Sequence, residues 1–310
     1  MKSAYKENVL PDMAAWRRSG LKTALVTLVR IEGVSPRPLG SQMAVNENGE
    51  ACGLITGGCA EAAIIAEAQD VIAKGANRCV RFGVGSPYMD VRLPCGSGID
   101  VFFDATLPGP DVDALLAAQD ARRPAAIAFD LARLKTGLCA PEMGAACDEY
   151  VKTYAPDTKL LIIGKGAATP FTAQMARAAG FEVHVFSPEA ETLEDAKPFC
   201  ATVAHLTSDE QSILPAMDLW TAVVTLFHEH EWELNFLQSA LRSDCFYIGA
   251  LGSRRTHADR LSMLREKGMD EKNLQRISGP VGIDIGAKSP PEIALSIIAE
   301  IVETRRRLDL

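Results

Sequence analysis

The stretch KLLIIGKGAATPFTAQMARAAGFEVHVFSPE, residues 159–189, decides the fold of this 310-residue chain. It opens with an apolar run, turns at Gly164 and Gly166, continues with apolar residues at helical spacing, and ends in a second strand-like run after Gly180. A strand, a glycine turn, a helix and another strand in this order form the first βαβ unit of a doubly wound parallel sheet. The stretch therefore predicts a Rossmann-like α/β domain.

Apolar runs farther along the chain extend the same sheet. Residues 222–227 and 245–252 are typical of central strands, and a helical pattern follows each of them. The last segment begins at Ser289, carries prolines in its first turn, and has Glu292 in place to complete a capping box. We assign residues 156–310 to the Rossmann-like domain.

The residues upstream predict a separate domain of mixed α/β type. A helix is expected near residues 8–18, and a buried strand over 21–33. The turn signal NENG at 46–49 predicts a hairpin. A helix that ends at Gly75 follows, and then two more strands. We assign residues 1–150 to this N-terminal domain.

Residues 107–157 have no clear period. The run at 125–134 fits either a strand or a short helix, and residues 136–150 resemble a loop. Pro156 and Asp157 break the pattern and indicate that a linker ends there.

Composition and charge exclude several functional classes. With 47% hydrophobic and 23% charged residues, the chain is an ordinary globular protein. The net charge is −8, and the longest basic block is the tail TRRRLDL, so we expect no nucleic-acid partner. No uncharged apolar run reaches transmembrane length, so we expect a cytoplasmic protein without membrane contact.

The eight cysteines contain no C-x-x-C pair, which argues against a zinc knuckle, an iron-sulfur cluster and a secreted disulfide framework. Four of them lie in apolar settings and are candidates for the core: Cys52, Cys79, Cys200 and Cys245.

Cys59 follows Gly57 and Gly58 and precedes a predicted helix. The helix dipole there favours a thiolate, and free backbone amides of the loop would suit a phosphate or an oxo group. The alternative is a small buried residue at a tight turn. Cys95 lies in a second glycine-flanked loop, and two loop cysteines are better explained by ligand binding than by packing.

Arg37 lies between two prolines in a loop, a setting suited to a bidentate grip on phosphate. The alternative is a surface arginine held by a carboxylate. His228 and His230 follow a strand together with three acids, but their spacing is weak support for a metal site. His228 is more plausible as a polar wall of a ligand cleft, and Arg254, after the next strand, suits anion binding.

The glycine turn at Gly164 and Gly166 departs from the dinucleotide-binding pattern. Thr169 occupies the place of the third glycine, and Ser187 occupies the place of the ribose-binding acid, with Glu189 two residues later. Three functions stay open for this turn: an NAD(P) site, a site for another phosphate ligand, or a glycine turn needed for chain geometry.

Seven segments, taken together, resemble the XdhC/CoxI family, the xanthine dehydrogenase accessory proteins. They are GVSPRPLGSQM (33–43), GLITGGCAEA (53–62), PCGSG (94–98), KLLIIGKGAATP (159–170), TLFHEHEWE (225–233), YIGALGSRRTHADR (247–260) and GPVGIDIGAKSPPEIALSIIAEI (279–301). Their order and spacing carry the resemblance through most of the chain.

The resemblance implies a cytoplasmic chaperone that binds the molybdenum cofactor (molybdopterin). Such a chaperone holds the cofactor while a cysteine desulfurase supplies its sulfido ligand, and then inserts it into a molybdenum hydroxylase of the xanthine dehydrogenase type. It is a maturation factor rather than an enzyme.

The resemblance also assigns roles to individual residues. Gly57, Gly58 and Cys59 match the family's Gly-Gly-Cys, and Cys95 and Arg37 match its second loop cysteine and its loop arginine. Cys59 and Cys95 would hold the molybdenum, and Arg37 the pterin phosphate. Ala167 and Ser187 stand where the family more usually has His and Asp.

Two other classes of protein compete with this hypothesis. One is an NAD(P)-dependent oxidoreductase that uses the Rossmann-like domain, and the other is a redox sensor that pairs Cys59 with Cys95. The hydroxylase itself is excluded, because such enzymes are long chains with iron-sulfur cysteine clusters. We expect a homodimer, the commonest oligomeric state.

Overall fold

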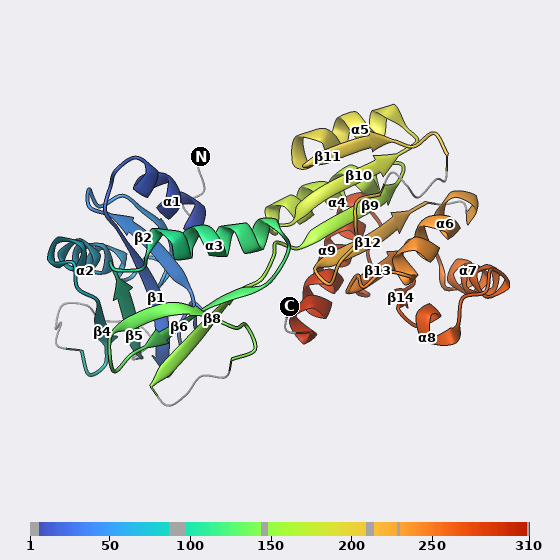
Figure 1. The fold of residues 1–310 in the computed structure, drawn as a ribbon. Coiled ribbons are helices and arrows are strands. Elements are labelled where there is room, and N and C mark those ends of the chain that lie inside the picture. The colour runs from blue at the N-terminus through green and yellow to red at the C-terminus, as the bar shows by residue number, and fades with distance from the viewer. Residues whose placement is uncertain (1–5, 87–96, 144–147, 209–213, 228–229, 309) are drawn as a thin grey trace. The chain divides into compact units, whose positions relative to one another are not determined.

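The computed structural model describes residues 6–86, 97–143, 148–208, 214–227, 230–308 and 310. The chain divides into two compact units, Met1–Pro156 and Asp157–Leu310 (Figure 1). Each unit has its own sheets and its own hydrophobic core.

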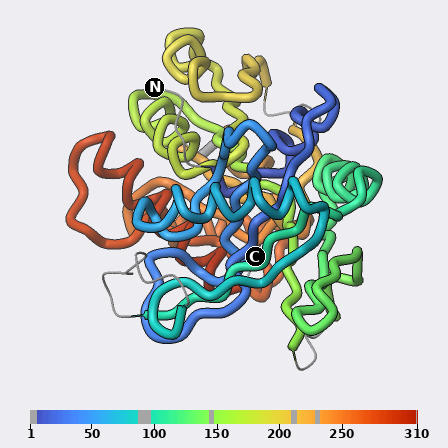
Figure 2. The backbone as a smooth tube through the Cα atoms, turned by 90° about the vertical axis from the view of Figure 1, so that its left-hand side faces the viewer, coloured from blue at the N-terminus to red at the C-terminus, as the bar shows by residue number. Residues whose placement is uncertain are grey.

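The main sheet of unit 1 is antiparallel, with strand order β3-β2-β1-β5-β4. Its strands are β1 (Thr23–Glu32), β2 (Gln42–Asn46), β3 (Ala51–Gly53), β4 (Arg78–Gly83) and β5 (Gly98–Asp104). Helix α2 (Glu61–Lys74) lies across one face (Figure 2). Helices α1 (Leu10–Arg18) and α3 (Gly109–Asp120) pack against the other face. Because both faces are covered, β1 is apolar and buried along most of its length.

A second, smaller sheet of unit 1 corrects the prediction for residues 136–150. It has the order β7-β6-β8 and consists of β6 (Ala125–Asp130), β7 (Lys135–Cys139) and β8 (Glu149–Tyr154). The residues predicted to form a loop contain most of β7 and the start of β8. Strand β7 is only half-buried, so it shows no apolar alternation and depends on its pairing with β6.

Unit 2 contains one parallel sheet with strand order β11-β10-β9-β12-β13-β14. Its strands are β9 (Lys159–Gly164), β10 (Glu182–Ser187), β11 (Thr202–His205), β12 (Thr221–Leu226), β13 (Tyr247–Ala250) and β14 (Ile277–Ser278). Numbered within the unit, this is the 3-2-1-4-5-6 order of the doubly wound fold. The predicted α/β class with a Rossmann-like C-terminal domain is therefore confirmed.

Helices cover both faces of the parallel sheet. They are α4 (Ala168–Ala178), α5 (Ala190–Ala196), the 3-10 turn η1 (Lys197–Phe199), α6 (His230–Leu241), α7 (Arg254–Glu266), α8 (Glu271–Leu274) and α9 (Pro290–Arg307). Helices α4 and α9 share one apolar cluster with β9 and β12, and α6 and α7 share another with the opposite face. The loops that follow the strands therefore meet at the carboxyl edge of the sheet, where open α/β sheets bind ligands.

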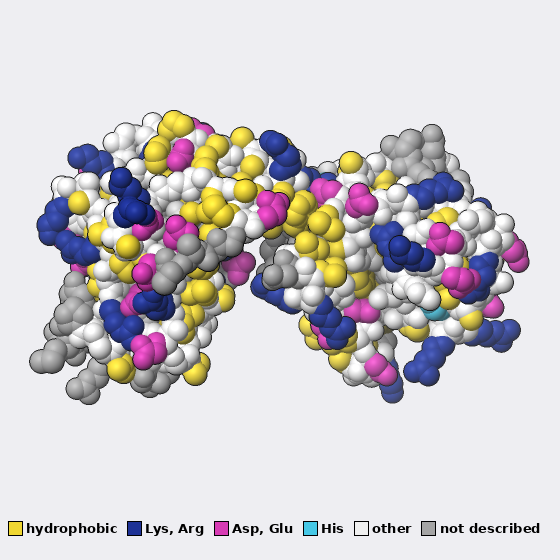
Figure 3. Space-filling view, turned by 60° about the horizontal axis from the view of Figure 1, so that its bottom comes forward, with side chains coloured by type: hydrophobic (Ala, Val, Ile, Leu, Met, Phe, Trp, Pro, Cys, Tyr) yellow, Lys and Arg dark blue, Asp and Glu magenta, His cyan; other side chains and the backbone are white. Residues whose placement is uncertain are grey.

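On the face shown in Figure 3, acidic and basic side chains of the described residues are interspersed. Among the described helices, none combines the length and the apolar character needed to cross a bilayer.

Candidate functional site

The Gly-Gly-Cys loop connects β3 to α2. Gly57 and Gly58 have φ of +78° and +115°, a region that side-chain-bearing residues rarely adopt, so the turn requires both glycines. The chain then enters α2 at Glu61, and the thiol of Cys59 is exposed. The loop thus presents a free thiol to solvent at the start of a helix.

The other described cysteines contrast with Cys59. Cys245 is buried, and Cys52, Cys79 and Cys200 are half-buried against the hydrophobic cores. Burial raises the pKa of each of the last three thiols to about 11, so they are protonated at neutral pH. Cys59 is therefore the described cysteine best placed to meet a ligand.

The amides predicted to be free in the Gly-Gly-Cys loop are already bonded. The carboxylate of Glu61 accepts hydrogen bonds from Gly57 N at 3.0 Å, Gly58 N at 2.7 Å and Ala60 N at 3.2 Å. It also accepts from Thr56 N at 2.7 Å and Thr56 Oγ1 at 2.6 Å. An acid in the first turn of a helix is attracted to exposed amides, and here it fills the place predicted for a phosphate or an oxo group.

The loop that carries Arg37 lies near the Gly-Gly-Cys loop. A Cβ added at Gly57 would lie 4.0 Å from the Cβ of Pro36, so the two loops lie near each other. Arg37 is mostly buried, and its Nη2 lies 3.8 Å from a carboxylate oxygen of Glu7. The alternative hypothesis for Arg37 requires a carboxylate beside it, and Glu7 provides one. About one fifth of the arginine side chain stays exposed.

Two of the predicted site residues, Cys95 and His228, lie outside the described residues. The described chain resumes at Ser97, whose Oγ accepts a hydrogen bond from Val34 N at 3.0 Å. The Arg37 loop, which begins at Gly33, therefore lies near the Gly-Gly-Cys loop at Pro36 and is hydrogen-bonded to Ser97 through Val34.

In unit 2, the glycine turn after β9 is also bonded to an acid of the same chain. Gly166, with φ of +76°, donates its N–H to Glu189 Oε2 at 3.0 Å and to Thr192 Oγ1 at 3.1 Å. In a dinucleotide site this amide would face the pyrophosphate. Glu189 thus brings a negative charge to the position that a phosphate would occupy. It lies two residues after Ser187, which stands where a ribose-binding acid would be.

The rest of the turn also departs from a dinucleotide site. Thr169 is fully buried, and its hydroxyl has no hydrogen-bond partner in the described part of the chain. Ser187 is buried and accepts a hydrogen bond from Glu189 N at 3.1 Å. The residues present therefore fit a dinucleotide poorly unless Glu189 moves.

Gly164 is needed for close strand packing. A Cβ at this residue would lie 2.6 Å from Leu226 Cβ and 2.7 Å from the Leu226 carbonyl oxygen in β12. We expect Gly164→Ala to lower the free energy of unfolding of unit 2 by roughly 1–3 kcal/mol, the usual cost of overpacking. Urea denaturation measures this loss.

A matched control for this substitution is Gly137→Ala in β7. A Cβ there would meet nothing within 4 Å, and the φ of Gly137 is not positive. We expect little change in stability, and an equal loss in both variants would contradict the packing argument for Gly164.

Arg254 lies at the same sheet edge as the glycine turn. It is the first residue of α7, directly after β13, and its exposed side chain makes no ion pair with a described residue. Strand β12 lies between β9 and β13 in the parallel sheet, so the Gly166 turn and Arg254 follow strands on either side of it. The structure thus brings Gly164, Gly166 and Arg254 to one edge of unit 2, and Arg37, Gly57, Gly58 and Cys59 to one region of unit 1.

Arg260 and Glu233 form a buried ion pair near this edge, which the sequence alone did not reveal. Arg260 Nε donates to Glu233 Oε1 at 2.8 Å, and both side chains are at most 1% exposed. Thr225 Oγ1 donates to the same carboxylate at 3.2 Å, and Arg260 also bonds the Leu251 carbonyl oxygen. The pair joins α6 and α7 beneath the loops that follow β12 and β13. The sequence signal was that Arg260 shares a face of α7 with buried Leu264, one turn later.

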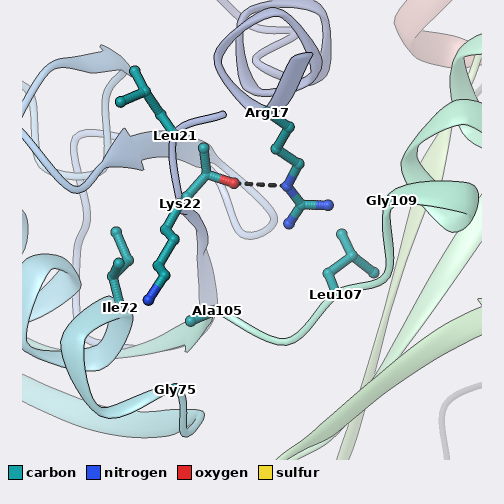
Figure 4. A pocket seen from close by; sticks show the side chains of 9 residues that line it. Arg17, Leu21, Lys22, Ile72, Gly75, Ala105, Leu107 and Gly109 are labelled. Atoms are coloured by element: carbon teal, nitrogen blue, oxygen red, sulfur yellow. Dashed lines mark hydrogen bonds between the residues drawn. The ribbon is translucent and has the colours of Figure 1, made fainter. Parts of the chain in front are cut away.

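A pocket of about 410 Å³ lies at the opposite end of α2 from Cys59 (Figure 4). Its lining includes Arg17, Lys22, Ile72, Gly75 and Leu107. Partial burial lowers the pKa of Arg17, whose Nε donates to Thr23 Oγ1 at 2.8 Å. The fourteen residues of α2 separate this pocket from the Gly-Gly-Cys loop by about 20 Å. None of the predicted site residues lines it.

Fold and loops together define a class: two-unit α/β proteins that pair an exposed Gly-Gly-Cys thiol with a Rossmann domain. Residues 160–301 match the family model described as "XdhC Rossmann domain", and residues 16–83 match the one described as "XdhC and CoxI family". The chain is also 36% identical to the molybdenum cofactor insertion chaperone PaoD of Escherichia coli, over 93% of this chain and 85% of PaoD. This chain belongs to the XdhC and CoxI family.

The chain is also similar to two more distant proteins. The chain is 22% identical to a protein of Bacillus subtilis described as a probable xanthine dehydrogenase component, over 93% of this chain and 94% of that protein. A crystal structure described as a xanthine dehydrogenase from Bacillus halodurans matches with a TM-score of 0.79. It is 20% identical and covers 96% of each chain, which supports the fold alone.

Proposed function

We propose that this protein is a molybdenum cofactor insertion chaperone. It binds the finished cofactor, shields it during sulfuration by a cysteine desulfurase, and passes it to a molybdenum hydroxylase of the xanthine dehydrogenase type. The observation that carries the proposal is the exposed Cys59 thiol on its glycine turn, in a chain 36% identical to PaoD. The cofactor is cargo, and the protein itself catalyses no reaction.

The chemistry of the two loops suits this cargo. Molybdenum in an oxo-sulfido state favours soft thiolate ligands, which Cys59 supplies together with Cys95. The pterin phosphate is bound by Arg37, whose loop lies near the Gly-Gly-Cys loop at Pro36 and Gly57. The loop amides are bonded to Glu61, so the guanidinium rather than the backbone binds the phosphate. Contacts that can be exchanged suit a protein that must release its ligand.

We further propose a cellular compartment, an oligomeric state and a binding role for unit 2. The chaperone acts in the cytoplasm, where its hydroxylase client and the desulfurase are made. It works as a homodimer, which is the commonest assembly of soluble proteins. Gly164, Gly166, His228 and Arg254 of unit 2 are proposed as a separate site for an anionic ligand such as a nucleotide.

The decisive experiment is co-purification. The protein is produced in a host supplied with molybdate, purified, and analysed for molybdenum by mass spectrometry and for pterin by fluorescence after acid oxidation. We expect both in constant proportion, and neither from a host that cannot make the cofactor. A protein that carries neither from the molybdate-supplied host would contradict the proposal.

A second candidate is an NAD(P)-dependent oxidoreductase, favoured by the 3-2-1-4-5-6 sheet and its glycine turn. Glu189 opposes it, because its carboxylate occupies the Gly166 amide. We therefore expect weak binding of NAD and NADP to the wild type, and severalfold tighter binding to Glu189→Ala, which frees the amide and removes a like charge. Calorimetric titration measures both.

The control for this titration is Glu191→Ala, which removes an exposed acid from the same helix without touching the turn. Equal affinities in the Glu189 and Glu191 variants would show that Glu189 does not guard the turn. Tight binding of either nucleotide to the wild type would favour the oxidoreductase.

A further inference from the structure

Glu61 forms more bonds than a helix cap requires. Five donors reach its two carboxylate oxygens, at distances between 2.6 and 3.2 Å. The amide of Ala60, the N-cap residue of α2, is already satisfied in another way, because Ala60 N also donates to Thr56 Oγ1 at 2.9 Å. The carboxylate instead turns back from α2 and binds the two glycine amides of the Gly-Gly-Cys loop.

These bonds form the kind of cradle that binds oxyanions elsewhere. Backbone amides at a glycine turn before a helix bind phosphate or sulfate in many proteins, because the amides and the helix dipole both favour negative charge. Here the cradle already contains an anion that belongs to the chain. A free oxyanion would have to displace it and would meet its charge.

We infer that Glu61 is a specificity-determining residue, which occupies the amide cradle so that the Gly-Gly-Cys loop rejects free oxyanions and offers its thiol instead. The inference rests on the proposed function and deepens it: a carrier of a metal cofactor must not be blocked by phosphate, sulfate or molybdate. Glu61 acts through the loop and is not itself a ligand of the cargo.

The test uses the full chain and the alkylation of Cys59 by iodoacetamide, followed by peptide mass spectrometry. Phosphate and, separately, molybdate are added as probes. We expect neither anion to change the alkylation rate of the wild type. In Glu61→Ala the cradle is open, and each anion should slow alkylation severalfold by binding beside the thiol. Glu61→Gln keeps the size of the side chain without its charge, and should show intermediate protection.

Asp70→Asn is the matched control, because it removes one carboxylate from the same helix far from the loop. It should behave as the wild type does. Thermal unfolding of each variant shows whether it is folded, and Glu61→Gln keeps the test valid if Glu61→Ala unfolds. Protection of the wild type equal to that of the variants, or protection of none of them, would overturn the inference.

This result is independent of cofactor binding. Anion protection in Glu61→Ala, with no cofactor on the purified wild type, would leave the inference standing and reject the proposed function. The reverse pattern would reject the inference alone.

Discussion

Replacing Cys59 by alanine is expected to remove most of the molybdenum and pterin that co-purify with the protein. Even the residues that support a metal ligand change metal affinity by about 10–100-fold when mutated, and loss of the ligand itself is expected to cost at least as much. Cys59 is the exposed thiol of the loop, so no other described cysteine can substitute for it without unpacking a core or a strand. Metal and pterin are quantified as in the co-purification experiment.

Cys139→Ala provides the control for this substitution. Cys139 is half-buried in β7, and burial raises the pKa of its thiol. We expect this variant to retain the cofactor as the wild type does. Full retention by Cys59→Ala would exclude Cys59 from the site, and equal losses in both variants would point to a general effect on folding.

Replacing Arg260 by methionine is expected to cause the largest loss of stability. It leaves Glu233 as a buried carboxylate without its cation, and breaking a buried pair in this way costs roughly 3–5 kcal/mol. Arg260 also holds the Leu251 carbonyl oxygen, so the loop after β13 loses a contact as well. Urea denaturation of the full chain, followed by circular dichroism, should show an earlier transition for unit 2.

Two further variants separate the charge effect from loss of volume. The double variant Glu233→Leu, Arg260→Met removes both charges and should recover much of the loss, because it leaves no unpaired ion. Arg265 lies on the same helix as Arg260, and Arg265→Met breaks its exposed pair with Glu271 of α8, so it should change stability little. A double variant as unstable as the Arg260 variant would contradict the argument.

The part of the fold that could be predicted has strong local signals. Residues 159–164 are wholly buried, Gly166 needs a positive φ, and the helix after it has a clear apolar face, so one βαβ unit was enough to predict the doubly wound sheet. Strand β7 had no such signal. It contains Gly137 and is half-exposed, and its conformation is set by the pairing with β6 rather than by its own residues.

The candidate site shows the same division between local and tertiary effects. The glycines before Cys59 indicated a tight turn, but they left open whether its thiol is exposed, as the structure shows, or buried. Glu61 was visible two residues later, but sequence does not show that its side chain turns back onto those glycines. Glu233 and Arg260 are 27 residues apart, and only the packing of α6 against α7 joins them.

The architecture of unit 2 also affects how its specificity can change. Strands β9 and β12 are buried along their whole length, whereas residues 165–167 and 251–253 lie in the short connections beyond the strand ends. Substitutions in these connections leave the sheet's interior untouched, so ligand preference can diverge between homologues while the scaffold persists. If the corresponding connection of a relative replaces one of these connections, the chimeric protein should still fold.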